Sequence, residues 1–255
     1  MNASALRSGN PTLGETTFEK ASRNQAASGV MTLQGAINKT GLLTLIVFAA
    51  ALFSWTRFFA NPEQGVQSVY MYSMIGAIGG FVVAIVTVFK MEWSPVTAPI
   101  YAVLEGIFLG GISAIFETQY PGIAIQAVGL TFGVMIVMLF LYSSKVIRVT
   151  ENLKIGIVAA TGAIAVYYLV SLVLGLFGIN APLINDNGWL GILFSLFVVG
   201  VAAFNLVLDF DFIESGVQKG APRFMEWYSA FGLLVTLVWL YIEILRLLSK
   251  LRSRN

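Results

Sequence analysis

The fold class of this chain is indicated by the stretch Pro99-Ile-Tyr-Ala-Val-Leu-Glu-Gly-Ile-Phe-Leu-Gly-Gly-Ile-Ser-Ala-Ile-Phe116. This stretch is apolar over nearly the length of a membrane-spanning helix, which needs about 20 residues, yet it contains the carboxylate of Glu105. A charge at the bilayer centre costs roughly 2.5–3.5 kcal/mol on insertion scales, so such groups usually face a bundle interior, a water-filled cavity or an ion path. The stretch therefore predicts a membrane helix that carries a buried acid.

The composition of the whole chain supports the same interpretation. Of the 255 residues, 57% are hydrophobic and 11% are charged, whereas a soluble domain carries about 25% charged residues. The net charge of +2 gives no indication of a nucleic-acid partner. The absence of Cys excludes disulfides and thiolate metal sites, and there is no His. Any pH response near neutrality must therefore come from carboxylates that burial makes harder to ionise.

Seven apolar segments predict an all-α fold, a polytopic membrane protein with seven transmembrane helices in a compact bundle. The predicted spans lie near residues 41–60, 70–90, 97–117, 122–143, 154–179, 189–213 and 226–248. Together they form a transmembrane domain over residues 30–250. A polar tail over 1–29, expected to be disordered, precedes the domain, and a basic tail over 251–255 follows it.

Prolines and glycines refine this outline. Five prolines are expected in connections: Pro62, Pro95, Pro121, Pro182 and Pro222. Pro99 is expected in the first turn of its helix, where a missing N–H costs little. Three pairs of small residues predict close packing of neighbouring helices: Gly76 with Gly80, Gly106 with Gly110, and Gly129 with Gly133.

The Lys and Arg residues predict the orientation. With seven crossings, the side of the N-terminus carries ten of them: Arg7, Lys20, Arg23, Lys39, Lys90, Lys145, Arg148, Lys154, Lys219 and Arg223. The opposite side has only Arg57 before the basic C-terminal tail. The positive-inside rule then places the N-terminus in the cytoplasm. Because the basic tail would face outward, six crossings with a re-entrant segment remain an alternative to the favoured seven.

Two neighbouring acids lie near the end of the sixth span, in Phe204-Asn-Leu-Val-Leu-Asp-Phe-Asp-Phe-Ile213. At roughly 100° per residue, Asp209 and Asp211 point to different faces of one helix. We expect Asp209 to face the bundle, with Asn205 one turn before it, and for Asp211 a solvated helix end is equally compatible. For Glu105 two interpretations stay open: a functional acid, or a protonated structural Glu held by a hydrogen bond.

The last span carries two more acids and a hydroxyl. An acid at a helix N-terminus is stabilised by the helix dipole, which is the simplest interpretation of Glu226. Glu243 and Arg246 predict an i, i+3 ion pair that snorkels toward the interface, with a gate role as the second interpretation. Thr236 is a candidate hydrogen-bond partner in mid-span.

Several classes of membrane protein are excluded because the chain lacks the residues that they need. A retinal pigment needs a Lys in the seventh span, and residues 226–248 have none. Membrane metalloproteases and rhomboid-type serine proteases need His, and intramembrane aspartyl proteases need a Gly-x-Gly-Asp motif that is absent. No P-loop pattern occurs either. The chain is therefore not expected to be an enzyme, and no cofactor is expected.

Three stretches resemble the Bax inhibitor (transmembrane Bax inhibitor motif) superfamily in its bacterial branch. They are Ala98-Pro-Ile-Tyr-Ala-Val-Leu-Glu-Gly-Ile-Phe-Leu-Gly-Gly-Ile-Ser113, Asn205-Leu-Val-Leu-Asp-Phe-Asp-Phe-Ile213, and the last span from Glu226 to Leu248. With the span count, the resemblance covers about residues 30–250. It implies a bundle with the last helix central, located in a bacterial inner membrane.

The resemblance also implies a pH-sensitive calcium leak in which acids on the sixth and seventh helices hold a closed state. The first of these acids falls on Asp209. The second does not carry over, since Thr236 stands at its position and Glu243 lies two turns further on, roughly 10 Å along the helix. Glu105 is our own candidate for the second carboxylate.

We therefore expect a cation leak channel for calcium, modulated by protons. The candidate ion path or pH sensor comprises Asp209, Glu105, Asp211, Thr236 and Glu243, with Asp209 and Glu105 as candidate calcium contacts, because hard cations prefer oxygen ligands. The bilayer, calcium and protons are the expected partners. The alternatives are a non-conducting regulator that binds other membrane proteins, such as a protease or stress-response component, and a proton-coupled transporter.

Overall fold

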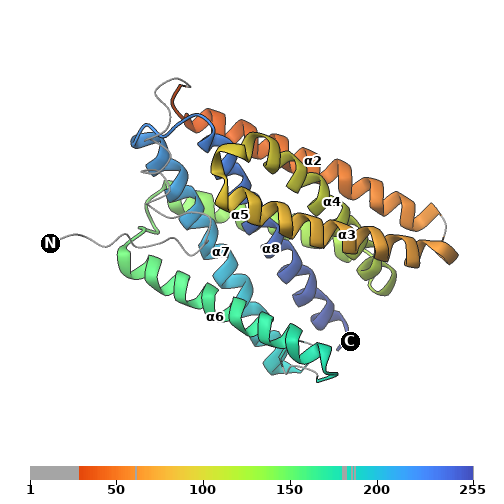
Figure 1. The fold of residues 1–255 in the computed structure, drawn as a ribbon. Coiled ribbons are helices and arrows are strands. Elements are labelled where there is room, and N and C mark those ends of the chain that lie inside the picture. The colour runs from red at the N-terminus through yellow and green to blue at the C-terminus, as the bar shows by residue number, and fades with distance from the viewer. Residues whose placement is uncertain (1–28, 61, 180–182, 185, 187, 255) are drawn as a thin grey trace. The chain divides into compact units, whose positions relative to one another are not determined.

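The structure, a computed structural model, describes residues 29–60, 62–179, 183–184, 186 and 188–254. Within these residues seven helices are long and apolar enough to cross a membrane (Figure 1). They are α2 (Leu33–Ala60), α3 (Pro62–Phe89), α4 (Ser94–Gln119), α5 (Ile123–Ser143), α6 (Glu151–Leu176), α7 (Trp189–Gln218) and α8 (Met225–Arg252), with a 3-10 turn η1 (Met91–Trp93) before α4. The predicted all-α, seven-span fold is confirmed. The expected disorder of the tail falls on residues outside those described, apart from Gly29.

Several helices extend beyond the predicted spans, because a helix can continue past the hydrocarbon into the interface. The first, α2, begins at Leu33, whereas the predicted span begins near residue 41. Thr32 provides the start signal, since its Oγ1 accepts a hydrogen bond from the Gly35 N–H at 2.9 Å. At the start of α6 the Thr150 side chain accepts from the Leu153 N–H in the same way.

The predicted places of three prolines are wrong. Pro62 is the first residue of α3, and Pro95 lies in the first turn of α4. Both positions tolerate proline because a first-turn N–H has no partner within the helix. Pro99 lies beyond that turn, inside α4, where it removes one backbone hydrogen bond. Pro121 and Pro222 lie outside helices as expected, and Pro182 is outside the described residues.

The contacts divide the chain into two compact units. Unit 1 comprises Ile125–Asp211 and Thr236–Asn255 and so holds α5, α6, most of α7 and the second half of α8. Among the described residues, unit 2 comprises 29–124 and Phe212–Val235, which include α2, α3, α4, the end of α7 and the first part of α8.

Glycines set the close approach of helices in unit 2. A Cβ at Gly106 would meet the Val47 carbonyl oxygen of α2, and one at Gly110 would overlap Ala51 of the same helix. A Cβ at Gly76 would lie 2.6 Å from the Leu104 carbonyl oxygen of α4. Two of the three predicted small-residue pairs therefore contain glycines that pack a helix against its neighbour. The third, Gly129 with Gly133 on α5, has no described atom within 4 Å of either added Cβ.

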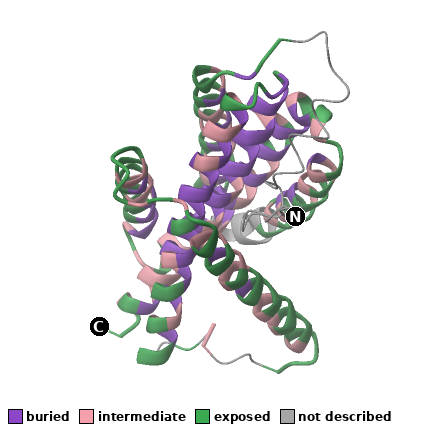
Figure 2. Cartoon of the chain, turned by 90° about the vertical axis from the view of Figure 1, so that its left-hand side faces the viewer, coloured by how far each residue is buried: buried purple, intermediate pink, exposed green. Residues whose placement is uncertain are grey.

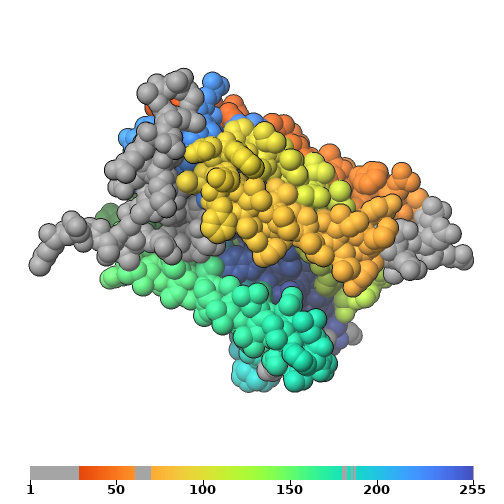
Figure 3. Space-filling model, viewed as in Figure 1, coloured from red at the N-terminus to blue at the C-terminus, as the bar shows by residue number. Residues whose placement is uncertain are grey.

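Burial differs sharply between helices, as the colours of Figure 2 indicate. Of the residues in the most apolar 18-residue stretch of α8, 67% are buried, whereas in the corresponding stretch of α6 only 11% are buried. Large apolar side chains are exposed along α3 and α6, both visible in Figure 3, and they include Ile78, Phe81, Val166, Leu169 and Leu172. Such exposure suits a lipid environment, where apolar surface need not be hidden.

Candidate functional site: buried carboxylates in the spans

Glu105 is a buried acid in the middle of α4. Its residue is 8% exposed, and no hydrogen bond or ion pair among the described residues holds its carboxyl group. A Cβ at Gly80 of α3 would lie 2.8 Å from Glu105 Oε2, so the glycine provides the space for this carboxyl. The aromatic ring of Tyr101, one turn earlier, packs edge-on against Phe231 with centroids 5.0 Å apart. The hydrogen-bonded interpretation of Glu105 therefore finds no partner within the part of the chain described.

Asp209 lies on α7 with an exposure of 0%. Asn205, one turn earlier, is also buried, and its Nδ2 donates to Thr161 Oγ1 of α6 at 2.8 Å and to the Val201 carbonyl at 2.9 Å. The Oδ1 of Asn205 is buried and accepts no hydrogen bond from the described residues. The expected inward position of Asp209 is thus observed, and a polar side chain accompanies it on the same helix face.

Asp211, two residues on, has a different environment. Its side chain is 27% exposed, and its Oδ2 lies 3.2 Å from Lys154 Nζ at the start of α6. The same ammonium is 3.8 Å from Glu151 Oε1. The two faces predicted from the 100° helical repeat are therefore observed. The ion pair with Lys154 favours the structural interpretation of Asp211, at the boundary rather than in an ion path.

Glu243 and Arg246 form the predicted ion pair, with Nη1 2.9 Å from Oε1. The expectation that the pair snorkels is wrong, because Glu243 is only 1% exposed. The reason is Tyr168 of α6, whose hydroxyl donates to Glu243 Oε1 at 2.8 Å and accepts from Arg246 Nη1 at 2.8 Å. The carboxylate is thus held inside unit 1 by a cation from its own helix and a hydroxyl from another.

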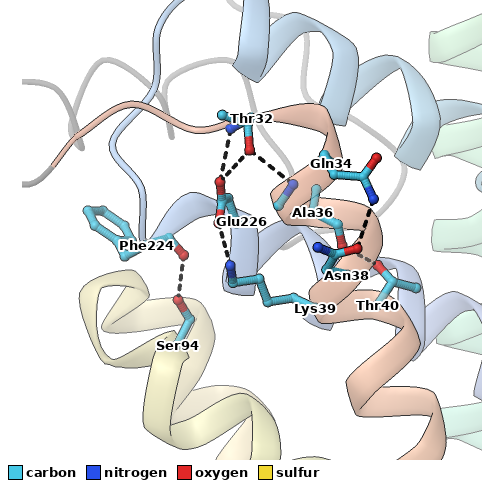
Figure 4. Close-up of polar contacts among 10 residues, drawn as sticks. Thr32, Gln34, Ala36, Asn38, Lys39, Thr40, Ser94, Phe224 and Glu226 are labelled. Atoms are coloured by element: carbon cyan, nitrogen blue, oxygen red, sulfur yellow. Dashed lines mark hydrogen bonds and ion pairs between the residues drawn. The ribbon is translucent and has the colours of Figure 1, made fainter.

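Glu226 has a stronger environment than a helix dipole alone. Its Oε1 accepts from the Thr32 N–H at 3.0 Å and from Thr32 Oγ1 at 2.9 Å, and its Oε2 pairs with Lys39 Nζ at 2.6 Å (Figure 4). The Ser94 hydroxyl donates to the Phe224 carbonyl at 3.1 Å nearby. Sequence reasoning missed this cluster because Lys39 and Glu226 are 187 residues apart. No local spacing signals such a pair.

Lys250 is a second buried charge that sequence reasoning missed. The basic residues at the end of the chain are expected to face outward from the membrane, yet Lys250 is only 3% exposed. Its Nζ donates to the Leu183 carbonyl at 2.7 Å and to the Gly191 carbonyl at 3.0 Å. The ammonium thereby holds the start of α7 to the last turns of α8 within unit 1.

The candidate residues fall into both units. Glu105 belongs to unit 2, and Asp209, Asp211, Thr236 and Glu243 belong to unit 1. Thr236 is buried on α8. The partnership of Asp209 with Glu105 stays a prediction. In the part of the chain that the structure describes, no three acidic residues come together as a metal site would require, so calcium contacts at Asp209 and Glu105 stay predictions too.

Comparison with protein families identifies the family of the chain. A family model described as Bax inhibitor 1 like matches residues 10–253, which include all seven helices and every buried acid described above. No curated protein and no solved structure matches the chain.

Proposed function

The chain belongs to the Bax inhibitor 1 like family, and on that premise we propose that it is a pH-sensitive cation leak channel with calcium as the permeant ion. It is an integral, multi-pass membrane protein. The membrane we propose is a bacterial inner membrane, with the N-terminus in the cytoplasm, as the basic residues of that side indicate. The proposed activity needs no resident cofactor and no bond chemistry.

The observation that carries the proposal is the complete burial of Asp209 inside a transmembrane helix. A carboxylate at such a position is expensive, and the cost is usually tolerated where the group serves an ion or proton pathway. Burial is also how a protein brings the titration of a carboxyl group toward neutrality. A chain without His has no other ordinary group for that purpose.

Asn205 adds a chemical reason for a proton-dependent state. A protonated carboxyl group can donate one hydrogen bond, whereas the ionised group only accepts. The buried Oδ1 of Asn205, one turn before Asp209, is an acceptor without a described donor. We propose that neutral Asp209 belongs to the closed state, and that its ionisation draws water and cations toward α7.

Thr236 is the position at which this chain differs from the arrangement that the family resemblance implies, in which acids on the sixth and seventh helices hold a closed state. A hydroxyl can donate a hydrogen bond to a carboxylate but carries no negative charge, so Thr236 cannot replace the second acid of such a pair. Glu105 stays our candidate for the second acid. Glu243 is already neutralised by Arg246 and bound by Tyr168, so we assign it a structural role rather than the gate.

The ion we propose follows from the available ligands. Calcium and other hard cations take carboxylate and carbonyl oxygens, and buried oxygens are what the spans offer. Since the described residues contain no cluster of three acids, a transit path fits better than a tight binding site.

The test is calcium efflux from liposomes that contain the purified protein, measured from pH 5 to 8. We expect a protein-dependent flux whose pH profile moves in Asp209→Asn. Asp211→Asn is the matched control, because it removes the same charge two residues away at a boundary position, and we expect its profile to stay. Glu105→Gln tests whether the second acid contributes. Absence of flux above empty liposomes at every pH, with folded protein, would reject the channel.

One observation favours a second candidate, a non-conducting regulator that binds other membrane proteins. Gly129 and Gly133 on α5 leave space on an exposed helix face, with no described atom within 4 Å of a Cβ added at either position. Pairs of this spacing let another helix approach closely in a bilayer. Under this alternative, Gly133→Leu would abolish association with a partner while Asp209→Asn would leave it intact.

A further inference from the structure

The segment that leads into α2 is joined by backbone hydrogen bonds to the segment that leads into α8. The Met31 N–H donates to the Ala221 carbonyl at 2.7 Å, and the Arg223 N–H donates to the Gly29 carbonyl at 3.0 Å. Between them Val30 and Pro222 form an isolated antiparallel bridge. We call residues 29–39 the strap. All of these contacts lie within unit 2.

Side chains then fix the strap to the first turn of α8. Glu226 Oε1 accepts hydrogen bonds from the N–H and the hydroxyl of Thr32, and Glu226 Oε2 pairs with the Lys39 ammonium (Figure 4). The Lys39 ammonium also lies 5.8 Å from the centre of the Trp227 ring, which is within cation–π range. Two consecutive residues of α8 therefore contact the same cation, and the Glu226 side chain is only 3% exposed.

The fit of the strap depends on the absence of a side chain at one position. A Cβ at Gly35, in the first turn of α2, would overlap the carboxyl group of Glu226. A glycine there lets the carboxylate sit directly against the helix, where the N–H groups of the first turn favour negative charge. Gly41, two turns later on the same helix, has no described atom within 4 Å of an added Cβ.

The strap links two distant parts of the sequence immediately before the helix that carries Thr236, Glu243 and Arg246. It also follows directly on 28 residues of polar sequence. Contacts that are made in one conformation and not in the other shift the equilibrium toward the conformation that makes them. The strap is bound to the first turn of α8 in the structure, so its release is the change that would act on α8.

We propose that the strap is a regulatory latch on α8: bound through Glu226, it holds the first turn of α8 and keeps the leak closed, and its release opens the leak. The effect on the leak rests on the proposed function, whereas the hold on α8 is measured separately.

The first test replaces Gly35 by Ala, which displaces the Glu226 carboxylate without removing any charge. We expect about tenfold faster amide exchange over residues 225–230, because several hydrogen bonds to a charged group are lost. We also expect a several-fold larger calcium leak. Gly41→Ala is the matched control, the same substitution on the same helix, and both readouts should equal those of the unsubstituted protein.

The second test closes the strap covalently. Directly opposed residues of a non-hydrogen-bonded antiparallel pair have Cα atoms about 4.5 Å apart, which is within the range of a disulfide. The chain has no Cys, so Val30→Cys with Pro222→Cys introduces the only possible pair. In the background of Gly35→Ala, oxidation should return both the leak and the amide exchange to the level of the unsubstituted protein. Reduction should reverse this.

The two readouts separate the possible failures. If the unsubstituted protein leaks, but Gly35→Ala and the oxidation state of the Cys pair change neither readout, the latch is rejected and the channel stands. If the protein does not leak at all, the channel is rejected, and amide exchange decides the latch. Faster exchange in Gly35→Ala than in Gly41→Ala supports it, and equal exchange overturns it.

Discussion

Two carboxylates on α8, Glu226 in its first turn and Glu243 in its second half, have similar environments. They differ in where along the chain the cation that pairs with each of them lies. Each is buried, each pairs with one cation, and each accepts from one hydroxyl. Arg246, the cation of Glu243, is three residues away on the same helix, whereas Lys39, the cation of Glu226, is 187 residues away. The first pair is made by helical geometry, and the second only by the fold.

This contrast indicates what each ion pair can control. An ion pair within one helix moves with that helix and disfavours its exposure to lipid. It does not fix the helix to a neighbouring helix. A pair between helices holds two elements together, and its loss lets them separate. Glu226 is therefore suited to regulation and Glu243 to stability. Tyr168 is the exception, since its hydroxyl ties the local pair to α6.

The largest expected effect is that of Arg246→Leu. It leaves Glu243, 1% exposed, without its cation, and breaking a buried pair from one side costs about 3–5 kcal/mol. Thermal or chemical unfolding in detergent measures the loss. The double variant Glu243→Leu with Arg246→Leu should recover most of it, because no lone charge remains. A double variant as unstable as the single one would contradict the role of the pair.

A smaller loss is expected at the other end of α8. Glu226→Gln keeps the shape and the Thr32 contacts but removes the charge paired with Lys39, and we expect a loss of about 1.5–3 kcal/mol. Lys39→Met should cost a similar amount. Since the two residues interact directly, their effects should not add, with a coupling energy of about 0.5–3 kcal/mol in a double-mutant cycle. Strict additivity would argue against the ion pair.

Tyr168→Phe tests how much the contact with α6 contributes to the environment of Glu243. It removes one hydroxyl that both donates to Glu243 and accepts from Arg246, yet it leaves the ion pair in place. We expect a loss of about 1 kcal/mol in the same unfolding assay, well below that of Arg246→Leu. A loss as large as that of Arg246→Leu would mean that the contact with α6, and not the local pair, holds Glu243.

The smallest effect is expected at the boundary. Asp211→Asn removes an ion pair with Lys154 whose carboxylate side chain is 27% exposed, and exposed pairs contribute about 0–1 kcal/mol. Raising the salt concentration should reduce even this difference. If Asp211→Asn destabilises the protein as much as Glu226→Gln does, exposure is the wrong criterion for ranking these acids.

The fold could be predicted from the sequence because its signals are local. Apolar runs of membrane length predicted seven helices, the 100° repeat predicted opposite environments for Asp209 and Asp211, and the i, i+3 spacing predicted the pair of Glu243 with Arg246. Boundaries were less accurate, since Pro62 and Pro95 occupy first turns where proline is tolerated and are not in connections.

The segments that enter the membrane, and the acids they carry, follow from the amino-acid sequence, because hydropathy and helical periodicity are properties of a few turns. Only the tertiary structure decided how those acids are satisfied. Lys39 meets Glu226, Tyr168 meets Glu243, and Lys250 meets two backbone carbonyls. These contacts join residues 59 to 187 positions apart, where partners are chosen by packing in three dimensions, and no spacing along the chain encodes that choice.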